Sequence, residues 1–172
     1  MAKIIYITGG ARSGKSSLAE SLAENFGSPL CYLATGEPRD QEMTERIAIH
    51  RQRRGSHWQT VEEPLLISRA LASADGRYQA ILVDCITLWI TNLLFHYDAV
   101  EPVLDDVTAL AESFSILKTP LILVSNEVGM GIVPENALAR SFRDLAGRAN
   151  QILAAAADDV YVTFSGIPLK LK

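Results

Sequence analysis

The chain has 172 residues and contains little of what marks several protein classes. It has only two cysteines, Cys31 and Cys85, each in an apolar run, which predicts reduced core thiols rather than a disulfide framework. It lacks a run of about 20 apolar residues, so we expect no membrane span. It also lacks an excess of basic charge, since its formal net charge is −4, which argues against nucleic acid as a partner. Because an apolar strand is predicted to begin at Lys3, we expect no signal peptide and a cytoplasmic protein.

Hydrophobic residues make up 48% of the chain, enough for the core of one domain spanning residues 1–172. Short apolar runs alternate with segments of helical spacing, which is typical of an α/β fold with a mostly parallel central sheet and helices on both faces. The predicted strands are Lys3–Thr8, Leu30–Ala34, His57–Val61, Ala80–Val83, Leu121–Ser125 and Asp159–Thr163, with 166–172 as a candidate seventh. The predicted helices are Ser16–Asn25, Gln41–Arg53, Leu65–Ser73, Leu88–His96, Val103–Lys118 and Glu135–Ala157.

One motif between the first predicted strand and helix carries most of the functional information. It fits the phosphate-binding loop G-x-x-x-x-G-K-S/T at every position. Its residues are Gly9, Gly10, Ala11, Arg12, Ser13, Gly14, Lys15 and Ser16. Backbone N–H groups of such a loop, together with the helix N-terminus, bind phosphate. We therefore predict a P-loop NTPase-like protein in which Lys15 reaches the β- and γ-phosphates of a nucleotide and the Ser16 hydroxyl ligates Mg²⁺.

Two further strand ends carry acidic residues. Asp84 follows the apolar run Ala80–Val83, where phosphate-loop enzymes place the carboxylate that holds Mg²⁺ or its water shell. We favour that role over a solvated strand-end carboxylate. Glu127 follows Leu121–Ser125 and begins a loop that contains two glycines and a proline. A γ-phosphate sensor or substrate contact fits this position, and so does a plain loop leading into a helix near Asn136; the residues alone do not separate these interpretations.

Basic residues cluster around His50, with Arg51, Arg53 and Arg54 following it. Arginines near a phosphate site can neutralise a polyphosphate, and a neutral imidazole there can attack phosphorus. On spacing alone, however, a solvated basic helix face is the favoured interpretation.

A second arginine group lies in the last predicted helix, at Arg140, Arg143 and Arg148. We expect these side chains to make surface pairs, for example between Arg143 and Asp144, with a phosphate contact as the alternative.

Four segments together resemble one known family. They are residues 7–16, the segment from Ala34 through His50 to Glu62, the segment 84–94, and the loop NEVGMGIVPEN at 126–136 with the helix residues 140–151 after it. The family is the bifunctional adenosylcobinamide kinase / adenosylcobinamide-phosphate guanylyltransferase of cobalamin biosynthesis. The resemblance covers nearly the whole chain in the same order, and its most specific parts are the loop 126–136 and the segment around His50.

The resemblance implies two consecutive transfers. Such an enzyme phosphorylates the aminopropanol hydroxyl of adenosylcobinamide with ATP or GTP. It then takes GMP from GTP onto a histidine, releases pyrophosphate, and passes GMP to adenosylcobinamide phosphate, which gives adenosylcobinamide-GDP. The histidine falls on His50, although Ile49 stands where members have a second histidine, and His57 is a less favoured candidate. The resemblance also implies a homotrimer.

The family's nucleotide contacts map onto a set of residues around the phosphate loop. Besides residues 9–16 they are Ala34, Thr35, Gly36, Arg51, Gln52, Arg53, Arg54, Glu62 and Asp84, with Ser16 and Asp84 directed to Mg²⁺. The chain departs from some relatives in having Asp84 for a glutamate and Gly36 for a polar residue. The shorter carboxylate still reaches a metal-bound water, and Gly36 still offers a backbone N–H.

Three other functions compete with this interpretation. A single-function P-loop small-molecule kinase without a covalent intermediate is the main alternative, and in such a kinase the His50 segment would be dispensable. A GTP-dependent switch is disfavoured because the chain has no N-K-x-D motif. A nucleic-acid motor is disfavoured because one small domain has no strand-tracking channel.

Overall fold

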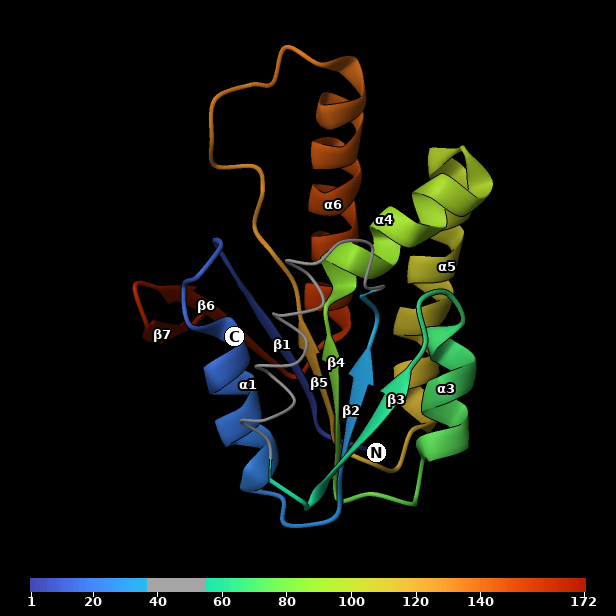
Figure 1. The fold of residues 1–172 in the computed structure, drawn as a ribbon, viewed down its shortest axis with the longest axis vertical. Helices are drawn as coiled ribbons and strands as arrows, with labels where there is room; N and C mark the ends of the chain where they lie inside the picture. The colour runs from blue at the N-terminus through green and yellow to red at the C-terminus, as the bar shows by residue number, and fades with distance from the viewer. Residues whose placement is uncertain (37–54) are drawn as a thin grey trace.

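The apolar runs of the sequence form a mostly parallel sheet (Figure 1). The computed structural model describes residues 1–36 and 55–172, and in this part of the chain seven strands lie in the order β3-β2-β4-β5-β1-β6-β7. Neighbouring strands are parallel except β6 and β7, which are antiparallel. The strands are β1 (Ile4–Gly9), β2 (Leu30–Ala34), β3 (Trp58–Glu62), β4 (Ala80–Asp84), β5 (Leu121–Val124), β6 (Asp159–Phe164) and β7 (Ile167–Lys170). The predicted α/β fold is confirmed, and so is the seventh strand in the tail.

The helices follow the predicted order. They are α1 (Lys15–Glu24), α3 (Ile67–Ala74), α4 (Ile86–Tyr97), α5 (Val100–Ser113) and α6 (Ala137–Ala156), with a short 3₁₀ helix η1 (Phe114–Ile116) after α5. The predicted helix Gln41–Arg53 lies outside the described residues. Among the helices that the structure describes, none has the length and apolar composition to cross a membrane.

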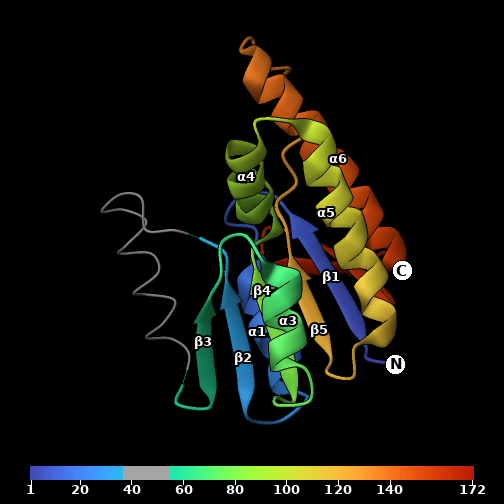
Figure 2. The same cartoon turned by 90° about the vertical axis from the view of Figure 1, so that its right-hand side faces the viewer.

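Helices cover both faces of the sheet, as predicted (Figure 2). Because successive strand residues point to opposite faces, β1 divides its side chains between two cores. Ile4 and Tyr6 pack with α3, α4, α5 and α6, whereas Ile5 and Ile7 pack with α1. Cys31 and Cys85 are free and buried, one in each core, as expected from their apolar surroundings.

The predicted helix Val103–Lys118 is wrong at both ends, since α5 begins three residues earlier and α-helical structure stops at Ser113. Two features end the helical structure after η1. The backbone N–H groups of Lys118 and Thr119 donate to Asp75 Oδ1 at 3.0 and 2.8 Å. Thr119 also precedes Pro120, and a residue before proline disfavours the α conformation. The chain therefore turns into β5.

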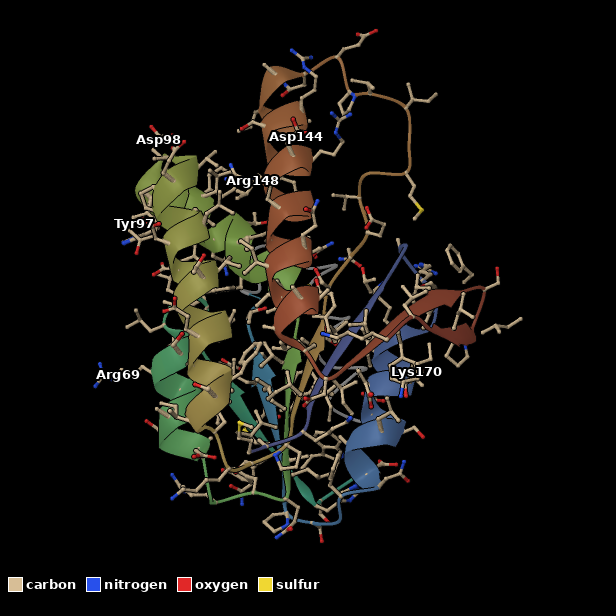
Figure 3. All side chains as sticks on the ribbon, turned by 180° about the vertical axis from the view of Figure 1, so that it is seen from behind. Arg69, Tyr97, Asp98, Asp144, Arg148 and Lys170 are labelled. Carbon is tan, nitrogen blue, oxygen red and sulfur yellow. The ribbon has the colours of Figure 1, made fainter. Side chains whose placement is uncertain are left out.

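The last strand is anchored by charge. Lys3 and Lys170, the latter labelled in Figure 3, both contact Asp159 carboxylate oxygens at 2.9 Å. Hydrogen bonds from Lys170 and then Lys3 hold the pKa of Asp159 below its usual range. This triad joins the residue before β1, the start of β6 and the end of β7, and so holds the β6–β7 hairpin beside β1.

Candidate active site

The phosphate-binding loop joins the carboxyl end of β1 to the first turn of α1. Gly9 and Gly14 have φ angles of 150° and 99°, which side chains disfavour. A Cβ on Gly9 would lie 2.6 Å from the Thr163 carbonyl oxygen, and one on Gly14 would lie 3.0 Å from Gly166 Cα. Gly14 is the N-cap of α1 and offers no capping side chain. The first-turn N–H groups therefore have no side-chain cap at Gly14, an arrangement that can bind an anion.

The turn between β6 and β7 supports this loop, a contact that the sequence reasoning missed. The Gly166 N–H donates to the Ser13 carbonyl at 2.8 Å, and the Ser13 and Thr163 hydroxyls lie 2.6 Å apart. The missing information was the order of the strands, because β6 becomes a neighbour of β1 only in the folded sheet. The hairpin therefore forms a wall of the phosphate loop.

Lys15 is a buried cation, 7% exposed, at the start of α1. Its ammonium donates to the Gly10 carbonyl oxygen within the loop. Burial lowers the pKa of Lys15 from its ordinary value, and the nearby Cys85 and Asp84 act in the opposite direction. A cation held in this way already lacks much of its hydration, which strengthens its interaction with a polyphosphate.

Ser16 and Asp84 meet across the gap between α1 and β4. The Ser16 hydroxyl donates to Asp84 Oδ2 at 3.0 Å, and the Tyr32 hydroxyl donates to the same oxygen at 3.1 Å. Sequence reasoning found Ser16 and Asp84 but missed Tyr32, whose side chain faces the α1 core from the neighbouring strand β2. A hydroxyl and a carboxylate beside a phosphate-binding loop are the hard oxygen donors that Mg²⁺ takes from a protein, so this pair fits the predicted ion.

The other predicted strand-end residues lie along the same edge of the sheet. Ala34 is in register with Glu62 on one side and with Asp84 on the other, so the Cα atoms of Glu62 and Asp84 are about 10 Å apart at the usual strand spacing. The Thr35 side chain is fully buried; its hydroxyl donates to the Cys85 carbonyl at 2.7 Å and accepts from the Cys85 N–H at 2.9 Å. Thr35 thus joins the carboxyl ends of β2 and β4.

Of the two histidines considered from the sequence, the structure describes one. His50 lies outside the described residues, as do Arg51, Gln52, Arg53 and Arg54. His57 directly precedes β3, at the amino ends of the parallel strands, and its Nε2 lies 3.6 Å from Glu24 Oε1. Glu24 ends α1, about 15 Å along the helix axis from the phosphate loop. The structure therefore places His57 at the opposite edge of the sheet from the loop.

The structure shows one of the two features that the sequence left open for the loop after β5. The Asn136 side chain accepts from the Ala139 N–H at 3.0 Å, which confirms Asn136 as the cap of α6. At the other end of the loop, the Glu127 N–H donates to the Gly9 carbonyl at 2.9 Å. The loop thus begins against the phosphate loop and ends as a helix cap, and a substrate contact by its first residues stays a prediction.

Two arginines of α6, Arg140 and Arg143, have hydrogen-bond partners in their own helix or in the loop before it. Arg143 donates to Asp144, labelled in Figure 3, at 3.0 and 3.1 Å, which confirms the predicted pair. Arg140 donates to the carbonyls of Pro134 and Glu135, so it closes the loop that leads into α6.

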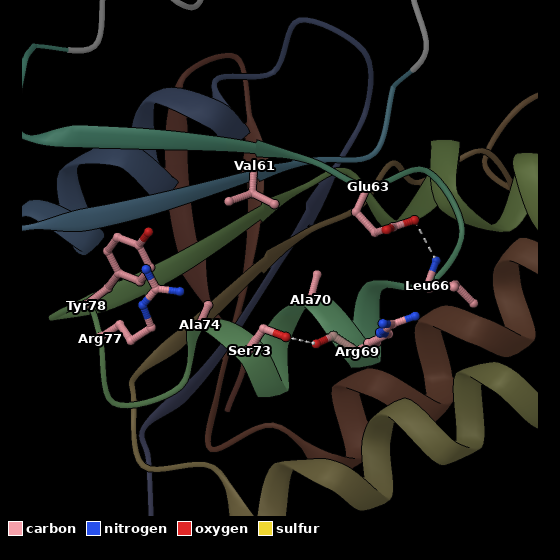
Figure 4. Close-up of a pocket in the computed structure, with 9 residues that line it drawn as sticks. All are labelled: Val61, Glu63, Leu66, Arg69, Ala70, Ser73, Ala74, Arg77 and Tyr78. Carbon is pink, nitrogen blue, oxygen red and sulfur yellow. Dashed lines mark hydrogen bonds between the residues drawn. The ribbon is translucent and has the colours of Figure 1, made fainter.

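A pocket of about 320 Å³ lies between β3 and α3, away from these residues (Figure 4). Its lining runs from Glu63 and Leu66 at one end to Arg77 and Tyr78 at the other. None of the predicted site residues within 1–36 and 55–172 lines it, so the chemistry indicated by the phosphate loop is not located there.

A phosphate loop between a parallel strand and a helix, with a carboxylate at the end of a nearby strand, defines a P-loop nucleotide-binding protein. The family model described as "Cobinamide kinase / cobinamide phosphate guanyltransferase" matches residues 5–171, and the chain belongs to that family. Its transferase function in cobalamin biosynthesis, predicted from the four segments, is thereby confirmed.

Curated relatives agree over almost their full length. The chain is 46% identical to the bifunctional adenosylcobalamin biosynthesis protein CobP of Pseudomonas aeruginosa, over 96% of this chain and 95% of the relative. It is 46% identical to the protein CobU of Salmonella typhimurium, over 98% of this chain and 99% of the relative. It is 42% identical to CobU of Escherichia coli over the same shares.

Proposed function

We propose that one nucleotide site, built on residues 9–16, serves two transfers within a single domain. The first moves the γ-phosphoryl group of ATP or GTP to the hydroxyl of adenosylcobinamide. The second moves GMP from GTP to adenosylcobinamide phosphate through a histidine. The observation that supports this best is the buried Lys15 beside the Ser16–Asp84 pair, because both transfers need charge neutralisation at the same polyphosphate.

In both reactions the loop binds the phosphate chain and Lys15 stabilises the charge that develops on it. The backbone N–H groups of residues 9–16 bind phosphate oxygens, assisted by the positive end of α1. The Ser16 hydroxyl and the Asp84 carboxylate would hold Mg²⁺, which when bound neutralises phosphate charge. The Tyr32 hydroxyl fixes the orientation of Asp84 through its 3.1 Å hydrogen bond. Ala34, Gly36 and Glu62 are proposed as nucleotide contacts from the adjacent strand ends.

His50 is the proposed nucleophile of the second reaction. A neutral ring nitrogen attacks the α-phosphorus of GTP, a P–N bond forms, and the bond to the β-phosphate oxygen breaks to release pyrophosphate. A phosphate oxygen of adenosylcobinamide phosphate then attacks the same phosphorus, and the P–N bond breaks to return the histidine. Arg51, Gln52, Arg53 and Arg54 are proposed to contact the nucleotide around this step. The position of His57 at the far edge of the sheet supports His50 over His57.

A cytoplasmic homotrimer is proposed on the resemblance. The loop 126–136 supports self-association because its apolar side chains are exposed, among them Met130, Ile132 and Val133. Light scattering of the purified protein measures the number of chains directly.

Labelling with GTP that is radioactive at the α-phosphate tests the covalent step. The wild type and His57→Ala should both carry acid-labile, alkali-stable label, whereas His50→Ala should carry none and still phosphorylate adenosylcobinamide. His57→Ala is the matched control, since it also removes one imidazole. An unlabelled wild type that retains kinase activity would contradict the guanylyl transfer and favour the single-function kinase. Label lost from His57→Ala and kept by His50→Ala would contradict the choice of nucleophile.

A further inference from the structure

A buried ring of hydrogen bonds holds the peptide groups that follow β5. Asn150 on α6 is 9% exposed, and its Oδ1 accepts from the Tyr6 hydroxyl at 2.7 Å and from the Ser125 hydroxyl at 2.8 Å. Its Nδ2 donates to the Asn126 carbonyl at 3.2 Å. The Asn126 N–H donates to the Thr87 hydroxyl at 2.7 Å, and that hydroxyl lies 3.3 Å from Ser125 Oγ. Asn126 is thus held at both its N–H and its C=O.

The directions of these bonds follow from the chemistry of the groups. A backbone carbonyl can only accept, so the Asn150 amide nitrogen must face Asn126 and its oxygen must face the two hydroxyls. Burial raises the pKa of Tyr6 above its ordinary value, so its hydroxyl stays protonated and donates. The Thr87 hydroxyl accepts from Asn126 and can donate to Ser125. Every member of the ring is satisfied, and such networks hold their parts in one arrangement.

The ring also lies against the phosphate loop. The Ser125 N–H donates to the Ile7 carbonyl, and the Glu127 N–H donates to the Gly9 carbonyl, both at 2.9 Å. Asn126 stands between these two bonds. Its side-chain amide makes no hydrogen bond to any of the residues that the structure describes, so this amide is available to a substrate at the edge of the sheet that carries the loop.

We propose that Asn150 is a positioning residue for the transfer reactions, which holds the Asn126 amide and Glu127 beside the phosphate loop from α6. The proposal rests on the function proposed above. The proposal extends that function because Asn150 lies outside the phosphate loop and acts on the reaction through Asn126 and Glu127.

The test is Asn150→Asp in the full-length protein, with Tyr6→Phe as the matched control. Asn150→Asp keeps the side-chain size and both acceptor contacts but places an oxygen against the Asn126 carbonyl. Tyr6→Phe removes a hydrogen bond to the same Oδ1 and leaves the Asn126 bond in place. We expect kcat for phosphorylation of adenosylcobinamide to fall at least tenfold in Asn150→Asp, with KM for ATP within threefold. In Tyr6→Phe, kcat should stay within twofold even where the melting temperature falls.

The pH profile separates positioning from general damage. A protonated aspartic acid can donate to the Asn126 carbonyl, so the rate of Asn150→Asp relative to the wild type should recover as pH falls from about 8.5 to 6. Burial favours the neutral form of the introduced carboxyl, and so does the negative charge of Glu127, which acts on the neighbouring Tyr6. Hydrogen bonds from the Tyr6 and Ser125 hydroxyls favour its ionised form. Cys85 also acts on Tyr6 and stays neutral, because burial raises its pKa to about 12. Thr87→Val, which removes the other bond to Asn126, should reproduce the loss of kcat and serves if Asn150→Asp does not fold.

Three results would overturn the proposal while wild-type activity is intact. The first is a wild-type kcat in Asn150→Asp or, where that variant does not fold, in Thr87→Val. The second is a kcat in Tyr6→Phe that falls as far as in Asn150→Asp. The third is a relative rate that does not change with pH. An inactive wild type would instead contradict the proposed function itself.

Discussion

Replacing Lys15 by methionine should separate activity from stability. Methionine has a similar length but no charge, so the variant keeps the side-chain volume in the first turn of α1. Lys15 is proposed to make charge-assisted hydrogen bonds to two phosphate oxygens, each worth about 1.5–3 kcal/mol. The loss of about 3–6 kcal/mol in the transition state corresponds to roughly a 100- to 10,000-fold lower kcat/KM, at 1.4 kcal/mol per factor of ten. The effect should appear in both transfers.

The same change should cost the folded protein little. Burial lowers the pKa of Lys15, which means that the folded state holds the charged form at a disadvantage. Below the lowered pKa both states are charged, so the loss in the free energy of unfolding is constant. Between the lowered pKa and the ordinary value of 10.5 the folded state loses its proton first, so the free energy of unfolding rises with pH. Removal of the ammonium offsets the lost bond to Gly10, so we expect the free energy of unfolding at pH 7 to change by less than about 1 kcal/mol. The variant should also lack the wild type's gain in stability at alkaline pH.

The assay combines initial rates of both transfers with urea unfolding at pH 7 and pH 10. A variant within tenfold of the wild-type rate in either transfer would contradict the shared phosphate site. A variant that unfolds several kcal/mol more easily would contradict the account of Lys15 as a destabilising buried cation.

Two further outcomes follow from the loop and its surroundings. Asp84→Asn keeps the shape of the side chain but removes its charge, so kcat/KM should fall roughly 10- to 100-fold in both transfers and recover partly at high Mg²⁺; a loss in only one transfer would contradict a common metal site. Gly9→Ala should lower the free energy of unfolding by about 1–3 kcal/mol, because its Cβ would lie 2.6 Å from the Thr163 carbonyl oxygen. At Gly10, the added Cβ would have no heavy atom of the described residues within 4 Å, apart from those of its chain neighbours. Gly10→Ala should therefore be nearly neutral in urea unfolding, and equal losses in the two variants would contradict this explanation.

The features that were predicted correctly from the sequence are those encoded by residues close together in the chain. The phosphate loop was predicted because its glycines, Lys15 and Ser16 are contiguous and follow an apolar strand. Asp84 was predicted because it ends another such strand, and parallel strands bring their carboxyl ends to one edge. The cap at Asn136 and the pair between Arg143 and Asp144 are also local, within a few residues of their partners.

The features that the sequence did not predict are contacts between residues far apart in the chain. Tyr32 reaches Asp84 because β2 and β4 are neighbours, although 52 residues separate the two in sequence. Gly166 supports Ser13 because the last hairpin joins the sheet beside β1. In the sequence, Asn150 is one more polar residue in a predicted helix. Its partner Asn126 is identified only once the fold places α6 over the end of β5. No periodicity or spacing encodes these partners, since they are set by strand order and helix placement.

The most direct test of the central claim is product analysis by mass spectrometry. The purified chain is incubated with adenosylcobinamide, GTP and Mg²⁺, and the corrinoid is followed over time. The account predicts that the corrinoid first gains one phosphate and then GMP, with pyrophosphate released in step with the second product, and that Lys15→Met forms neither product at a comparable rate. A corrinoid that stops at the phosphate would contradict the second transfer, and an unmodified corrinoid would contradict the account as a whole.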